Sequence, residues 1–188
     1  LFSGATSLDG YVDEEGRTGG YLAANIAKEV FEKSTPNLRD ATGEANESIA
    51  AAMSEKGVLV EHRENLWSTA CAVVDIDRTK KKFDWVQISD AIMLLVYKDG
   101  SHKLVVPDYD HDTDLLSKWK EFADRGTPNI WPEMLPDIIE NRRQMNVTYG
   151  KLSGEPAAMN FLKYGQESLE NVRHLLLFTD GLILPLRD

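Results

Sequence analysis

The stretch Leu175-Leu176-Leu177-Phe178-Thr179-Asp180-Gly181-Leu182 joins a run of apolar residues to an Asp-Gly pair. An apolar run without helical periodicity is typical of a strand that is buried on both faces. The Asp-Gly pair then places a carboxylate at the rim of a sheet, and the glycine lets the backbone turn away or approach an ion closely. An ordinary turn after a core strand explains the same residues, so this stretch alone leaves both interpretations open.

A second carboxylate, Asp90, lies between the apolar residues 83–88 and the run Ala91–Tyr97. An unpaired carboxylate between two buried strands is costly, so Asp90 requires a metal, a cation or several hydrogen-bond donors. A turn-capping role is the alternative. Because Asp90 and Asp180 both stand at the ends of apolar strands, we predict that they approach each other at one rim of the fold.

The other elements follow from the two hydrophobic periods. Apolar residues at helical spacing predict helices, and short runs rich in β-branched and aromatic residues predict strands. We expect helices at residues 21–33, 38–57, 115–126 and 134–139, and strands at residues 67–76, 83–88, 91–97, 103–106 and 174–179. The four consecutive strands are expected to form an antiparallel meander.

This order of elements predicts an α+β fold, a four-layer α-β-β-α sandwich of two antiparallel sheets flanked by helix pairs. The 188 residues, 42% of them hydrophobic, suffice for one ordinary core, so we expect a single domain over residues 1–188. Leu1 is not an initiator methionine, and we expect the full protein to carry further residues at its ends.

The composition disfavours several classes of partner and cellular location. With 31 acidic against 21 basic residues, the net charge of -10 disfavours nucleic acid and anionic membrane surfaces as partners. The apolar run Ala91–Tyr97 is far shorter than the roughly 20 residues of a membrane-spanning helix. Cys71 is the only cysteine, which excludes an internal disulfide and favours a reducing cytoplasm.

The segment Gly16-Arg17-Thr18-Gly19-Gly20 leads directly into the first predicted helix. Backbone N–H groups at a helix start, together with the Arg17 guanidinium, form a possible anion site. The segment lacks the Gly-Lys-Ser/Thr ending of a nucleotide-binding P-loop. A flexible helix start is the alternative interpretation.

Five short motifs occur in an order that resembles the metal-dependent protein phosphatases of type 2C, and the bacterial stage II sporulation E-like branch in particular. They are Ser3-Gly4-Ala5-Thr6-Ser7, Gly19-Gly20-Tyr21-Leu22-Ala23, Trp67-Ser68-Thr69-Ala70, Ser89-Asp90-Ala91 and Phe178-Thr179-Asp180-Gly181-Leu182. The resemblance implies a β-sandwich flanked by helix pairs, two Mn²⁺ or Mg²⁺ ions, and attack of a metal-bridging water on phosphoserine or phosphothreonine. The strength of the resemblance lies in the order of the motifs.

The resemblance also implies roles for single residues. Asp180 and the carbonyl of Gly4 would be metal ligands, Asp90 would support a ligand or a third ion, and Arg17 would steer the phosphate. The first Asp-Gly of the family falls on Ser3-Gly4, so a hydroxyl stands where a carboxylate would bridge both ions. Asp9-Gly10 is the rival alignment, although no apolar strand precedes it.

Two functions follow as expectations. The first is a metal-dependent serine/threonine phosphatase that hydrolyses phosphate monoesters of a phosphorylated protein by metal-activated water. The second is a catalytically impaired, phosphatase-like module that binds a regulatory partner. Ser3 is the feature that favours the second.

Overall fold

The computed structural model describes residues 1–5, 7–33, 37–107 and 113–182. Its α-helices are α1 (Gly19–Glu32), α2 (Leu38–Glu55), α3 (Thr113–Asp124) and α4 (Trp131–Arg143). Its strands are β1 (Phe2–Ala5), β2 (Ser68–Asp77), β3 (Lys82–Ile88), β4 (Ala91–Tyr97), β5 (His102–Leu104), β6 (Lys163–Ser168) and β7 (Val172–Thr179). Three short 3-10 helices complete the described elements: η1 (Arg63–Asn65), η2 (Pro156–Phe161) and η3 (Asp180–Leu182).

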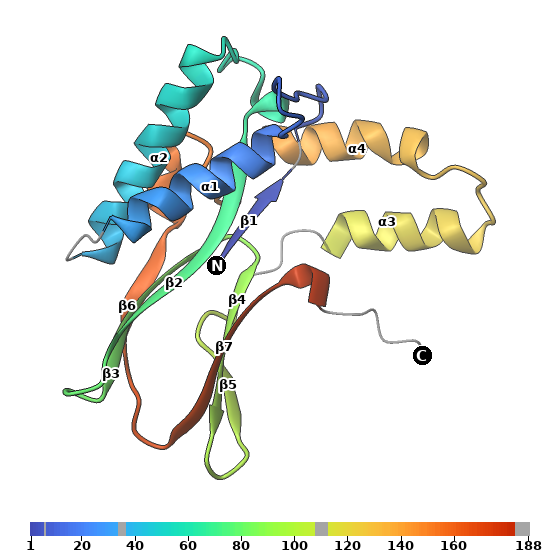
Figure 1. Cartoon of the computed structure of the whole chain (residues 1–188). Helices are drawn as coiled ribbons and strands as arrows, with labels where there is room; N and C mark the ends of the chain where they lie inside the picture. The colour runs from blue at the N-terminus through green and yellow to red at the C-terminus, as the bar shows by residue number, and fades with distance from the viewer. Residues whose placement is uncertain (6, 34–36, 108–112, 183–188) are drawn as a thin grey trace.

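The strands form two antiparallel sheets, which confirms the predicted fold class (Figure 1). The first sheet has the order β1-β2-β3-β6, and the second has the order β5-β4-β7. The predicted four-strand meander is wrong, because β3 and β4 belong to different sheets. Strand β3 pairs with β2 and β6, and β4 pairs with β5 and β7. Ser89, in the turn between β3 and β4, takes a left-handed conformation with φ of 65°, and the chain crosses there from one sheet to the other.

The space between the sheets is filled from alternate positions of the strands, as the two-residue period of a strand requires. The fully buried residues of this inner layer are Ala70, Ala72, Phe83, Ala91, Met93 and Leu95. On the opposite side of the second sheet, Leu176 is 44% exposed. The second sheet is therefore buried mainly through its inner face.

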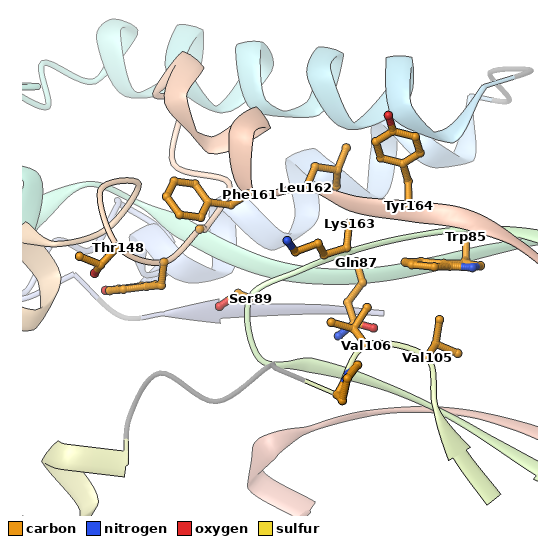
Figure 2. A pocket seen from close by; sticks show the side chains of 13 residues that line it. Trp85, Gln87, Ser89, Val105, Val106, Thr148, Phe161, Leu162, Lys163 and Tyr164 are labelled. Atoms are coloured by element: carbon orange, nitrogen blue, oxygen red, sulfur yellow. The ribbon is translucent and has the colours of Figure 1, made fainter.

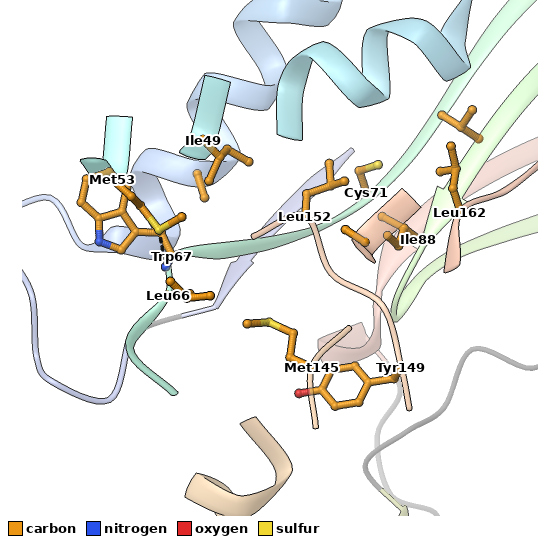
Figure 3. Packing of buried hydrophobic residues seen from close by; sticks show 13 residues of the cluster. Ile49, Met53, Leu66, Trp67, Cys71, Ile88, Met145, Tyr149, Leu152 and Leu162 are labelled. Atoms are coloured by element: carbon orange, nitrogen blue, oxygen red, sulfur yellow. Dashed lines mark hydrogen bonds between the residues drawn. The ribbon is translucent and has the colours of Figure 1, made fainter. Parts of the chain in front are cut away.

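Helices α1 and α2 cover the outer face of the first sheet (Figure 1). Side chains cap both helices: the Thr18 hydroxyl accepts a hydrogen bond from the N–H of Tyr21, and the Asn37 side chain accepts from Arg39 and Asp40. Their apolar stripes pack on β2 and β3 through Ile49, Met53, Trp67, Cys71 and Ile88 (Figure 3). This is the largest of the three clusters of buried hydrophobic residues in the described part of the chain.

Helices α3 and α4 lie beside one end of the two sheets rather than across a sheet face (Figure 1). Helix α3 buries none of its residues, and α4 buries only Met134. The glycine that was predicted to close the first of these helices, Gly126, has φ of 72°, as a C-terminal glycine cap requires. Among the described residues, no helix combines the length and the apolar character needed to cross a bilayer.

Candidate functional site

Asp90 and Asp180 come together at one end of the second sheet. Strand β4 begins directly after Asp90, β7 ends directly before Asp180, and Ala91 pairs with Thr179. Asp90 and Asp180 are therefore the residues next to this last strand pair, at the same edge of the second sheet. The sequence-based expectation that these residues approach each other at a rim is confirmed, although they are 90 positions apart in the chain.

The two carboxylates have different surroundings. Asp180 is exposed and begins η3, and its Oδ1 accepts a hydrogen bond of 2.9 Å from the N–H of Gly181. Asp90 is largely covered, with 13% of its side chain exposed, and its Oδ2 lies 3.3 Å from the ammonium of Lys151. The Lys151 side chain is itself only 10% exposed. A cation supplied by the chain thus accompanies the covered carboxylate.

Lys151 is held in place by a buried polar network. The side-chain oxygen of Asn146 accepts from the N–H of Lys151 at 3.0 Å, and its amide nitrogen donates to the Ser153 hydroxyl at 2.8 Å and to Glu155 at 3.0 Å. On helix α2, the Asn46 side chain accepts from the N–H groups of Ser153 and Gly154 and donates to the carbonyl of Glu155. The loop that carries Lys151 is therefore fastened to α2.

Lys151 is not among the site residues predicted from the sequence. One signal was present: Lys151 is the only basic residue between Arg143 and Lys163, in a stretch of small, apolar and amide residues. A lone lysine in such a stretch calls for an acidic partner. Its partner, Asp90, is 61 positions away, and nothing in the local sequence connects the two.

Ser3 and Gly4 lie on β1, opposite Ala70 and Thr69 of β2. A Cβ on Gly4 would lie 2.0 Å from the carbonyl oxygen of Gly20, and a Cβ on Gly20 would lie 2.5 Å from the carbonyl oxygen of Ala5. The backbones of β1 and the start of α1 are therefore in direct contact, and both positions require glycine.

The contact between β1 and α1 changes the interpretation of the glycine-rich helix start. Gly19 and Gly20 are buried, and a Cβ on Gly19 would lie 2.1 Å from Cδ1 of Trp67. These glycines serve close packing against β1 and against the tryptophan that precedes β2. A flexible helix start is excluded, because both glycines are in tight contact.

Arg17 and Asp9 both lie in the segment between β1 and α1. The Arg17 guanidinium donates to Asp13 at 2.7 Å and pairs with Glu15 at 2.9 Å. The pKa of the Asp13 carboxyl is lowered, first because the N–H of Arg17 donates to it and then because of the guanidinium, and the pKa of Arg17 is raised by its hydrogen bond to Asp13. Arg17 therefore already has two carboxylate partners.

Asp9 is exposed, and its side chain accepts a hydrogen bond of 3.0 Å from the N–H of Tyr11. The neighbouring Gly10 has no atom within 4 Å of an added Cβ. Asp9-Gly10 thus forms an open surface turn, in contrast to Ser3-Gly4, which lies on a strand in contact with the helix start. The geometry favours Ser3-Gly4 as the counterpart of the family's first Asp-Gly.

The donor groups do not fit a two-ion centre. Two adjacent divalent ions need several carboxylate oxygens, whereas the candidates here are one hydroxyl, one backbone carbonyl and two aspartates, of which Asp90 is paired with Lys151. Within the described ranges, no group of three or more His, Cys, Asp or Glu side chains is arranged to hold a metal ion.

The structure is similar to the crystal structure of the catalytic domain of the serine/threonine protein phosphatase PstP in complex with two manganese ions. The TM-score is 0.57 with 18% identity, over 97% of this chain and 66% of the PstP domain. The chain thus has the fold of a type 2C phosphatase catalytic domain, as the motif order implied, and it spans slightly less than two thirds of the PstP domain.

A Stage II Sporulation E family protein from Thermanaerovibrio acidaminovorans also matches, at a TM-score of 0.40 and 18% identity, over 62% of this chain and 50% of that protein. This likeness is too weak to carry an argument. No family model matches the chain, and no curated protein matches it at a significant level.

Proposed function

We propose that the chain is a phosphatase-fold module in which metal-dependent hydrolysis is weak or absent, and which binds a phosphorylated protein partner. The observation that carries this proposal is the ion pair between Asp90 and Lys151, 3.3 Å apart and almost fully covered. An ammonium next to a carboxylate repels a divalent cation from the same oxygen atoms. Asp180 then remains as the accessible carboxylate of the pair.

Ser3 supports the same proposal. If Ser3-Gly4 corresponds to the family's first Asp-Gly, as its contact with the start of α1 suggests, a neutral hydroxyl takes the place of a bridging carboxylate. Two cations without that negative charge repel each other strongly in a partly dry site. Uptake of two ions at this site is therefore expected to be poor.

The second candidate function is a metal-dependent serine/threonine phosphatase that uses Mn²⁺ or Mg²⁺. The position of Asp90 and Asp180 on neighbouring strands, with Asp180 exposed, favours it. Asp180, Asp90 and the carbonyl of Gly4 would then be the groups that face the ions, with Asp9 as the alternative to Ser3. Arg17 would have to leave Asp13 and Glu15 in order to contact a phosphate.

Hydrolysis of an aryl phosphate at saturating Mn²⁺ distinguishes the two functions. We expect little activity from the natural sequence and about a tenfold or larger increase from Ser3→Asp, because the substitution restores a bridging negative charge. Ser3→Asn is the matched control: it has the same size as Ser3→Asp without the charge and should remain inactive. Asp180→Asn on the Ser3→Asp background should abolish the gain.

Other outcomes identify the alternatives. Strong activity of the natural sequence that disappears in Asp180→Asn establishes the second candidate. Activity that disappears in Asp9→Asn, with Ser3→Asp having little effect, shows that Asp9 is the ligand. Strong activity that survives in both Asp180→Asn and Asp9→Asn rules out a metal-dependent phosphatase that uses these residues.

A further inference from the structure

A cavity lies between β3, β6 and residues 105–107 (Figure 2), and its wall includes Ser89, the residue before Asp90. Its volume is about 670 Å³, within the range of roughly 300–1,000 Å³ that small-molecule sites occupy. Trp85 and Phe161 supply aromatic surface to its wall. The Trp85 ring is held against β6 by Gly165, since a Cβ there would lie 3.0 Å from the ring.

Three polar side chains, two on β3 and one in the turn that follows it, line this cavity without a hydrogen-bond partner in the described part of the chain. They are the indole N–H of Trp85, both amide atoms of Gln87 and the hydroxyl of Ser89. Gln87 is only 1% exposed, and Figure 2 shows its side chain extending from β3 towards Val106. The large majority of buried polar side-chain atoms in native proteins are paired, so three unpaired side chains close together in one cavity wall leave room for a partner from outside the chain.

The charge of the cavity is unlike that of the rest of the chain. Among the described residues that line it, none is Asp or Glu, although the chain has 31 acidic residues. Lys163 lines the cavity, and its ammonium forms no ion pair within the described part of the chain. A ligand that enters this cavity therefore meets an available positive charge and no nearby carboxylate in the wall.

We propose that this cavity binds a small planar anion that also carries an amide or an equivalent donor–acceptor pair. The carboxylamide of Gln87 has one acceptor oxygen and two donor hydrogens, so it pairs with a group that donates and accepts side by side. The aromatic walls accept a flat ring, and Lys163 attracts a carboxylate or phosphate on it. Neither Asp90 nor Asp180 lines this cavity, and the proposal does not depend on the proposed function.

The test uses 4-carbamoylbenzoate, which carries an amide and a carboxylate on one ring, added to ¹⁵N-labelled protein in the presence of EDTA. We expect saturable shifts of the Trp85 indole and Gln87 side-chain signals, with a Kd of about 1–10 mM for a probe of this size. Benzamide, which lacks the carboxylate, and benzoate, which lacks the amide, should each bind about two to five times more weakly.

Two variants separate a specific site from general attraction of an anion. Lys163→Gln should weaken the binding of 4-carbamoylbenzoate about two- to fivefold and leave the binding of benzamide unchanged. The matched control Lys28→Gln removes the same charge from the exposed surface of α1 and should change the affinity for neither ligand. The proposal is overturned by an absence of saturable shifts up to about 20 mM, by equal binding of benzoate and 4-carbamoylbenzoate, or by equal effects of the two variants.

Discussion

Replacing Lys151 by methionine removes the cation next to Asp90 while keeping the length and the apolar part of the side chain. Both side chains are almost covered, 10% and 13% exposed, so the substitution leaves a carboxylate in poorly solvated surroundings. Breaking a fully buried pair costs roughly 3–5 kcal/mol. Because this pair retains some exposure, we expect Lys151→Met to lower the free energy of unfolding by about 2–3 kcal/mol and the Tm by about 5–10 °C.

Urea unfolding followed by circular dichroism measures this loss, provided that the dependence on denaturant stays the same for all variants. The double variant Asp90→Asn/Lys151→Met removes the carboxylate charge together with the ammonium. Its free energy of unfolding should therefore exceed the value expected from adding the two single losses by about 1–2 kcal/mol. Lys28→Met is the matched control: its ion pair with Glu32 is exposed, 56% and 62%, and its loss should change stability by less than about 0.5 kcal/mol.

Two results refute this reasoning. A Lys151→Met variant within about 0.5 kcal/mol of the natural sequence would show that Asp90 does not depend on the ammonium. Strict additivity in the double variant would show that the two residues are not coupled, since contacting charges give a measurable interaction energy.

Three further predictions concern other parts of the fold. Gly4→Ala should lower the free energy of unfolding by more than about 3 kcal/mol or prevent folding, because the new Cβ would lie 2.0 Å from the carbonyl oxygen of Gly20. Gly10→Ala is the control: Gly10 is in open space with φ of 71°, and thermal melts of the two variants should show a loss of only about 1 kcal/mol for it. Burial raises the pKa of the Cys71 thiol to about 12, so a thiol reagent at neutral pH should react only in denaturant, and rapid labelling of the native chain would contradict its burial. The folded pKa of Asp13 is below its ordinary 3.8, so its contribution to stability is present above that pH and is lost as the pH falls through the lowered value. Urea midpoints at about pH 6 and about pH 3 should therefore differ less in Asp13→Asn than in the natural sequence, and an unchanged difference would contradict this role.

The sequence predicted the elements that have an uninterrupted apolar run or a regular helical period. The expectation that the run at residues 175–178 is buried on both faces is wrong: β7 covers the inner layer with one face only, and Leu176 on its other face is 44% exposed. Strand β7 and helix α1 were predicted from their apolar residues alone, and both occur with ends close to the expected ones. Strand β6, Lys163–Ser168, was missed because its residues are mostly polar and exposed. The strand β6 forms because it pairs with β3, and a pairing between distant segments cannot be read from the local sequence.

The connection between the sheets was also missed, for a physical reason. A short Ser-Asp turn between two apolar runs is typical of a hairpin, and the sequence does not show that Ser89 adopts a left-handed conformation that sends β4 into the other sheet. The adjacency of Asp90 and Asp180 was predicted correctly because both residues end strands. The partner of Asp90 was not, because Lys151 reaches it through a loop fastened to a distant helix by Asn46.

The most direct test of the impaired metal centre is a calorimetric titration of the metal-free natural sequence with Mn²⁺. The ion pair of Asp90 with Lys151 and the hydroxyl of Ser3 predict no uptake of two ions at micromolar affinity. Uptake of two Mn²⁺ per chain with a Kd below about 10 µM, lost in Asp180→Asn, would contradict the account and establish a functional two-ion site in this chain.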